Sequence, residues 1–92
     1  LTDPAADLAV AAALVSALAD KPLPLRSIWF GEVSLSGEIR PVAHSSLRLR
    51  ESGKLGFDQA QGPQDAGERI SGIRYTGLGT LPKLVDRIMT GA

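Results

Sequence analysis

Four basic residues lie close together in the middle of the sequence. They are Arg40, Arg48, Arg50 and Lys54, and Glu51 is the acidic residue that stands among them. Guanidinium and ammonium groups contact the phosphates of nucleic acids irrespective of base sequence, so the cluster provides candidate contacts to duplex DNA. A solvent-exposed helix face carries the same pattern without any ligand, and that alternative stays open.

The charge of the chain is divided along its length. Ten Lys and Arg residues balance ten Asp and Glu residues, so the formal net charge is zero. The segment 58–68, which follows the basic cluster, contains acidic residues but no basic ones. The zero total is therefore an average. It excludes a uniformly basic nucleic-acid-binding protein but not a local basic surface.

Two segments resemble nucleotide-binding or catalytic motifs but lack their essential groups. Residues 62–67 have the glycine spacing of a phosphate-binding loop, yet Glu68 and Arg69 follow where that loop requires Lys and then Ser or Thr. His44 precedes two serines, but adjacent side chains on a helix point apart and do not form a catalytic triad. The sequence therefore predicts neither a nucleotide site nor a nucleophilic site in these segments.

The composition excludes several further classes of protein. There is no cysteine and one histidine, so we expect no disulfide, no thiol nucleophile and no metal site in this chain. The longest apolar run, Leu8 to Ala19, is shorter than the roughly 20 residues that cross a bilayer. Asp3 and Asp7 precede this run, where a signal peptide would carry positive charge. We therefore expect a cytoplasmic protein without membrane contact.

The elements that must position the basic cluster follow from local patterns. Ala5–Ala19 is predicted to form a helix capped by Asp3, and because it is apolar nearly all round, we expect it to be buried on several sides. Ser27–Leu35 has the composition of a strand. Ser36-Gly37 then indicates a hairpin turn, with Gly37 at positive φ, into a second strand over Glu38–Arg40.

The second half of the chain is predicted to add two helices and a strand. His44–Lys54 is expected to be a helix, Gln61–Ser71 an exposed, mobile loop, and Ile70–Thr76 a strand. A last helix begins after Thr80. Its apolar residues recur at helical spacing and are Leu81, Leu84, Val85, Ile88 and Met89. This order predicts an α/β (α+β) fold with helices packed on a small mixed sheet and a parallel crossover through the second helix.

The run over residues 31–42, GEVSLSGEIRPV, carries a resemblance to known proteins. With DPAADLAV at 3–10 and KLGF at 54–57, the chain resembles the C-terminal Lon-protease-like domain of the RadA (Sms) family of bacterial DNA repair proteins. The resemblance reaches from the first residue to about Phe57 and resumes over 72–89. It implies a Lon-protease proteolytic-domain-like fold, with residues 1–92 as a single domain truncated at its N-terminus. The Lon-like domain of the magnesium-chelatase-related ComM helicases is the alternative family.

The resemblance also implies that this chain is not itself an enzyme. Lon proteases of this fold use a Ser–Lys pair, and the aligned serine position is Ala5 while the lysine position falls near Ser46. Acyl transfer then has neither a hydroxyl nucleophile nor an amine to activate it. A Lon-type serine peptidase is the alternative function.

Further expectations concern the parent protein, which the resemblance describes as a DNA-dependent ATPase. Proteins of this family form homo-hexameric rings and promote branch migration of recombination intermediates with ATP. ATP with magnesium, and zinc, would then be bound by other domains of the parent, with no cofactor in this fragment. The implied partners are DNA, further copies of the chain, and recombinase and replication proteins. A purely structural oligomerisation module, with the arginines in salt bridges between subunits, is a third hypothesis.

Overall fold

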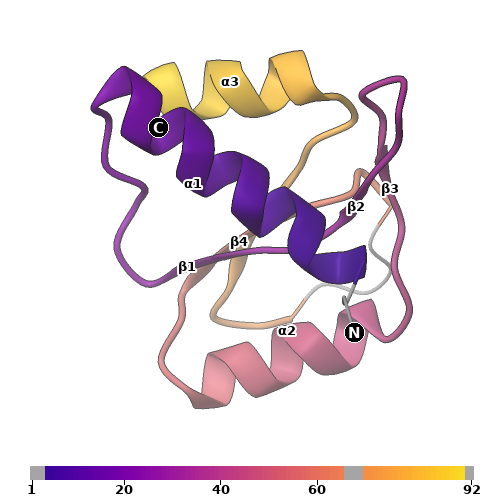
Figure 1. Ribbon diagram of the computed structural model, residues 1–92. Coiled ribbons are helices and arrows are strands. Elements are labelled where there is room, and N and C mark those ends of the chain that lie inside the picture. Colours follow the sequence, from indigo (N-terminus) through magenta and orange to yellow (C-terminus); the bar gives the residue numbers. More distant parts are fainter. Residues whose placement is uncertain (1–3, 66–69, 91–92) are drawn as a thin grey trace.

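The computed structural model describes residues 4–65 and 70–90 (Figure 1). Within these ranges the chain forms a short 3-10 helix, η1 (Pro4–Ala6), and the helices α1 (Asp7–Ala19), α2 (Ser45–Lys54) and α3 (Leu81–Thr90). The strands are β1 (Ser27–Trp29), β2 (Glu32–Val33), β3 (Ile39–Arg40), β4 (Gln59–Gly62) and β5 (Arg74–Gly77). The mixed α/β fold is confirmed. The predicted cap Asp3 lies outside the described residues.

A parallel three-stranded sheet forms the centre of the molecule. Its strand order is β1-β4-β5, and Ser27 pairs with Gln59, which pairs in turn with Arg74. The chain passes from β1 to β4 through α2, so the predicted parallel crossover is confirmed. The strands β2 and β3 form a separate antiparallel pair.

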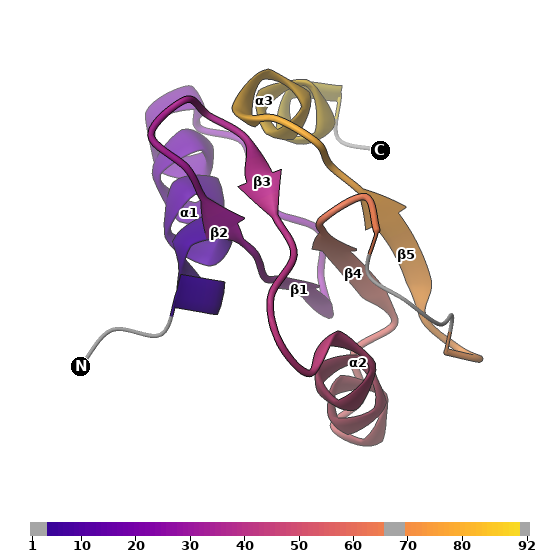
Figure 2. The ribbon, with the colours of Figure 1, turned by 90° about the vertical axis from the view of Figure 1, so that its right-hand side faces the viewer.

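Helices cover both faces of the parallel sheet (Figure 2). On one face, α1 and α3 pack Leu8 and Leu84 against Trp29. On the other face, α2 packs Leu49 against Ala60 and the neighbouring aromatic residues. Leu49 is 1% exposed. Burial of Leu49 therefore determines which side of α2 faces the sheet. The basic residues of α2 then lie on its other sides.

The segment predicted as an exposed loop over Gln61–Ser71 begins instead as part of the middle strand of the sheet. The last three residues of β4 are buried, and β5 follows as its parallel neighbour. The prediction was wrong because the strand contains no large apolar residue. Its small residues Ala60 and Gly62 allow close packing, since a Cβ atom at Gly62 would lie 2.7 Å from the Tyr75 hydroxyl. Residues 66–69 of the predicted loop lie outside the described residues.

The helix α1 is buried on fewer sides than its composition predicts. Leu8 and Ala12 are fully buried, but Val10, Leu14 and Leu18 are 57%, 59% and 88% exposed. In the described part of the chain, α1 packs against η1, β1, β2 and α3, and Val10, Leu14 and Leu18 on its outer face stay in solvent. The expectation of burial on several sides was therefore wrong. No helix within the described ranges combines the length and the apolar character needed to cross a membrane.

The strand predicted over Ser27–Leu35 is divided at Gly31. The N–H of Gly31 donates to the Ala5 carbonyl at 2.9 Å, and the Gly31 carbonyl accepts from the Leu8 N–H at 3.0 Å. These bonds join the chain to the start of α1 before the hairpin begins. The predicted hairpin is confirmed, and Gly37 has a φ of 85°, as the turn requires.

Candidate nucleic-acid interface

The helix α2 carries three of the four predicted contact residues. It begins after His44, whose φ of 63° turns the chain into the helix, and Ser45 Oγ donates to the Val42 carbonyl at 3.1 Å. Leu49 points to the sheet. The cations of α2 are therefore held on a helix whose start and buried side are both fixed.

Arg50 and Lys54 are brought together by α2. They are four residues apart, and this spacing places them on the same side of a helix. Both are exposed, and both line one hollow of about 340 Å³. Lys54 Nζ lies 3.7 Å from Glu51 Oε1, in an exposed pair of a kind that contributes little to stability. A phosphate can therefore compete for the Lys54 ammonium at small cost.

Arg48 lies on a different side of α2 from Arg50. Its Nε donates to the Ala43 carbonyl at 3.3 Å, so the side chain folds back toward the start of the helix. The residue is half-buried, and its own carbonyl accepts from Ser52 Oγ at 2.7 Å. The structure thus separates two arginines that are near neighbours in the sequence.

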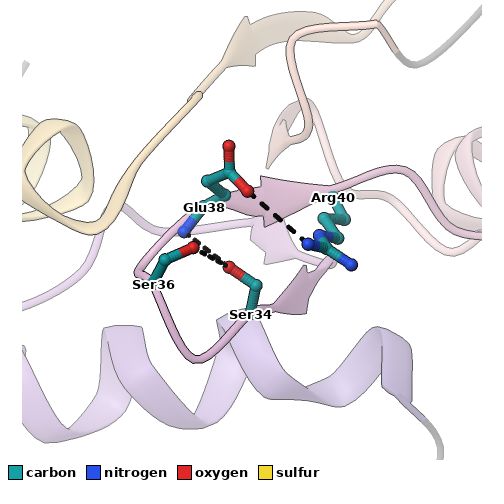
Figure 3. Close-up of polar contacts among 4 residues, drawn as sticks. All are labelled: Ser34, Ser36, Glu38 and Arg40. Carbon is teal, nitrogen blue, oxygen red and sulfur yellow. Dashed lines mark hydrogen bonds and ion pairs between the residues drawn. The ribbon is translucent and has the colours of Figure 1, made fainter.

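Arg40 lies on β3, among acidic residues. Its Nη2 is 3.6 Å from Glu38 Oε1 (Figure 3). Glu32 is its partner across the hairpin. Asp7 lines the same hollow of about 450 Å³ as Glu32 and Arg40. The carboxylates of Glu38, Glu32 and Asp7 make the electrostatic potential around the Arg40 guanidinium less positive. Arg40 therefore attracts phosphate less than Arg50 and Lys54 do.

The hairpin turn that precedes β3 is closed by Ser34. Its N–H donates to the Glu38 carbonyl at 2.9 Å, and its carbonyl accepts from the Gly37 N–H at 3.0 Å. Ser34 Oγ accepts from the Glu38 N–H and lies 3.0 Å from Ser36 Oγ (Figure 3). These bonds hold the turn in one conformation and keep Glu38 beside Arg40.

The positions expected for a protease pair contain no suitable side chains. Ala5 is 3% exposed, and its methyl group offers no hydroxyl. Ser46 is half-buried in the first turn of α2, where the family's amine would be expected. Among the described residues there is also no group of three or more His, Asp or Glu side chains that could hold a metal ion.

Arg74 is a basic residue that the sequence analysis missed. It is the first residue of β5 and pairs with Gln59, the first residue of β4. It is exposed and lines a hollow of about 410 Å³ together with Gln59 and Asp58. No local signal could have revealed this position, because Arg74 lies apart from the predicted cluster in the sequence and only the parallel pairing of β4 with β5 places it at the start of the sheet.

The fold and the site define a small mixed α/β domain that presents a basic helix to solvent. No protein-family model matches the chain. Comparison with curated proteins finds a DNA repair protein RadA of Brucella abortus, 48% identical over 90 residues that cover 96% of this chain. The chain therefore belongs to the RadA family of DNA repair proteins.

Further relatives carry the same name. A DNA repair protein RadA of Rickettsia typhi is 58% identical over 59 residues, which cover 64% of this chain and 13% of that protein. That of Aquifex aeolicus is 48% identical over 84 residues, which cover 91% of this chain and 19% of that protein. The Brucella protein is likewise covered over 19% of its length. The chain thus spans about a fifth or less of these three relatives and corresponds to a fragment of a RadA protein.

Proposed function

We propose that this chain is the non-catalytic Lon-like domain of a RadA-type DNA repair ATPase. In this role it scaffolds a hexameric ring and contacts DNA while recombination intermediates are processed and branches migrate. One observation carries the DNA-contact part of the proposal. Arg50 and Lys54 lie together on the exposed side of α2, at the edge of a hollow, and Lys54 is paired with Glu51.

The rest of the proposal follows from family membership and from the protease positions. Ala5 and Ser46 lack the hydroxyl and the amine at the places where a Lon-type peptidase would use them, which supports a role without proteolysis. We assign ATP, magnesium and zinc to other domains of the parent protein, and we place that protein in the cytoplasm with recombinase and replication proteins as further partners.

The DNA-contact proposal predicts a large effect from reversing two charges. In the purified protein that carries this sequence, Arg50→Glu with Lys54→Glu should weaken DNA binding at least tenfold near 0.1 M salt. The slope of log affinity against log salt should become shallower by about 2, because each cation removed takes away roughly one phosphate interaction. Fluorescence anisotropy with a labelled duplex at several salt concentrations measures both quantities.

The control for this experiment is Lys21→Glu with Lys83→Glu. These two lysines are exposed and lie outside α2, so the variant has the same net charge change at a different place. Arg40→Glu and Arg48→Glu should each have smaller effects than Arg50→Glu or Lys54→Glu, because several carboxylates lie near Arg40, and Arg48 is half-buried with its Nε bonded to the Ala43 carbonyl. Equal affinity and salt slope in the α2 variant and the control would contradict the proposal.

The oligomerisation hypothesis is favoured by a separate observation, the exposed apolar face of α1. Val10, Leu14 and Leu18 recur every four residues and form a continuous stripe in solvent. If this face holds copies together, Leu14→Glu with Leu18→Glu should reduce the mass of the assembly in solution, since a buried unpaired carboxylate opposes association. Light scattering after gel filtration measures the mass. Leu35→Glu, at a still more exposed leucine on the hairpin turn, is the control and should leave the mass unchanged.

A further inference from the structure

A hollow of about 340 Å³ lies between the carboxyl end of α2 and the turn before β5, and we call it the α2 hollow. One wall continues into Phe57, whose N–H donates to the Ser52 carbonyl at 3.0 Å. The other wall is a turn in which the Ile73 N–H donates to the Ile70 carbonyl at 3.2 Å. The walls meet closely, since a Cβ atom at Gly53 would lie 3.3 Å from Ile73 Cδ1. The hollow therefore lies between two segments whose backbones are held by hydrogen bonds.

The interior of the α2 hollow is apolar. Phe57, Ile70 and Ile73 line it, and each is half-buried, so each keeps apolar surface that the described part of the chain does not cover. Ile70 and Ile73 also pack against the buried cluster around Leu49, so the interior of the hollow continues into the core. A volume of this order is at the small end of ligand pockets and accommodates one large apolar side chain.

The rim of the α2 hollow is positively charged. Arg50 and Lys54 line it from α2, and both are exposed. Among the described residues, no carboxylate lines the hollow, although Glu51 lies 3.7 Å from Lys54 Nζ on the helix beside it. A positive rim around an apolar interior is complementary to a ligand that carries negative charges beside an apolar group.

We propose that the α2 hollow binds an extended, acidic peptide segment of a partner protein, with one large apolar side chain in the interior and carboxylates at Arg50 and Lys54. Carboxylates form charge-assisted hydrogen bonds with guanidinium and ammonium groups. The apolar side chain adds affinity in proportion to the surface that it removes from water. This site goes beyond the DNA contact proposed for α2, and the peptide and DNA would exclude each other there because they share the two cations.

The apolar interior is the observation that favours a peptide over duplex DNA as the ligand of the hollow. The phosphates of a duplex can reach Arg50 and Lys54, but its bases are stacked inside the double helix and cannot enter the hollow. A peptide presents acidic and apolar side chains on one flexible chain. Of these two ligands, only the peptide therefore occupies both the rim and the interior.

The test uses a short, fluorescein-labelled peptide of aspartates with a central phenylalanine, and the same peptide with alanine at the centre. Fluorescence anisotropy should show that the purified protein that carries this sequence binds the phenylalanine peptide about tenfold more tightly, because the two peptides differ only in the apolar side chain. The phenylalanine peptide should also displace a labelled duplex at a concentration about tenfold lower than the alanine peptide requires.

A variant that fills the hollow separates the peptide site from the DNA contact. Ser71→Trp introduces a large ring at an exposed residue that lines the hollow. It should weaken binding of the phenylalanine peptide about tenfold and leave binding of the duplex nearly unchanged. Thr90→Trp, at an exposed residue of α3, is the control and should bind both ligands like the unmodified protein. Circular dichroism of each variant verifies that the fold is retained.

The outcomes distinguish a failure of the peptide site from a failure of the proposed function. Equal affinity for the two peptides, or normal peptide binding by Ser71→Trp, would mean that the rim alone binds carboxylates, and the peptide site would be wrong while the DNA contact of α2 stands. If Ser71→Trp weakens duplex binding as much as peptide binding, the hollow serves DNA and the peptide site is overturned. If Arg50→Glu with Lys54→Glu loses the peptide but binds the duplex normally, the peptide site stands and the DNA contact fails.

Discussion

Gly62→Ala is expected to lower the free energy of unfolding by about 3 kcal/mol, at the upper end of what overpacking costs. A Cβ atom on this residue would lie 2.7 Å from the Tyr75 hydroxyl, 3.0 Å from the Phe30 carbonyl oxygen and 3.1 Å from Phe30 Cζ. None of these atoms can move aside easily. The Phe30 N–H is bonded to the Gln61 carbonyl at 3.0 Å, and the Tyr75 hydroxyl donates to the Pro63 carbonyl.

This destabilisation is large for a chain of this size. Domains are stable by about 5–15 kcal/mol in total, so the variant should melt more than about 10 °C below the unmodified protein. Thermal unfolding followed by circular dichroism measures the difference. Gly56→Ala is the control. It places a side chain at a φ of 96° with no atom within 4 Å, so it isolates backbone strain, which should cost about 1 kcal/mol.

A double variant identifies the cause of the destabilisation. In a Tyr75→Phe background the hydroxyl that would lie 2.7 Å from the new Cβ atom is absent. Gly62→Ala should then destabilise by less than it does alone, with a coupling energy of about 1 kcal/mol. Strict additivity of the two substitutions would contradict the assignment of the clash to the Tyr75 hydroxyl. An unchanged melting temperature in the single variant would contradict the packing of β4 against β5 at this position.

Elements with a strong local pattern were predictable from the sequence. The hairpin follows from Gly37 at the turn, and α3 follows from apolar residues at helical spacing, of which Leu84 and Ile88 are buried as expected. The strand β4 was not predictable, because its residues are polar or small and its burial depends on partners that come from both ends of the chain. Pairing with Trp29 and Thr76, on either side, is a property of the fold and leaves no trace in the strand itself.

The positions of the candidate contact residues were likewise predictable only in part. The grouping of Arg50 with Lys54 follows from helical spacing, so it could be predicted once α2 was predicted. The separate settings of Arg40 and Arg48 could not be predicted, because they depend on Glu32 across the hairpin and on the Ala43 carbonyl. The position of Arg74 could not be predicted either, since only the register of β4 with β5 places it beside Gln59 at the start of the sheet.

Substitution of the buried glutamine of β4 is expected to raise the stability of the protein, whereas substitution of Gly62 lowers it. Gln61 is fully buried, and neither its Nε2 nor its Oε1 has a hydrogen-bond partner among the described residues. Its register neighbours are Trp29 and Thr76, so its side chain lies on the face of the sheet that α1 and α3 cover. An amide that gives up its water without gaining a partner opposes folding by about 1–3 kcal/mol.

Gln61→Met should therefore stabilise the protein, which is unusual for a substitution at a fully buried position. Methionine has nearly the same length and no strong polar atoms, and it adapts to irregular apolar surroundings. We expect a gain of about 1–2 kcal/mol, seen as a melting temperature higher by roughly 5 °C or more. Gln64→Met, at an exposed glutamine three residues further along the chain, should change the melting temperature little. A lower melting temperature for Gln61→Met would mean that the amide makes hydrogen bonds in the folded protein, and the polar residue would then be part of what holds β4 in the middle of the sheet.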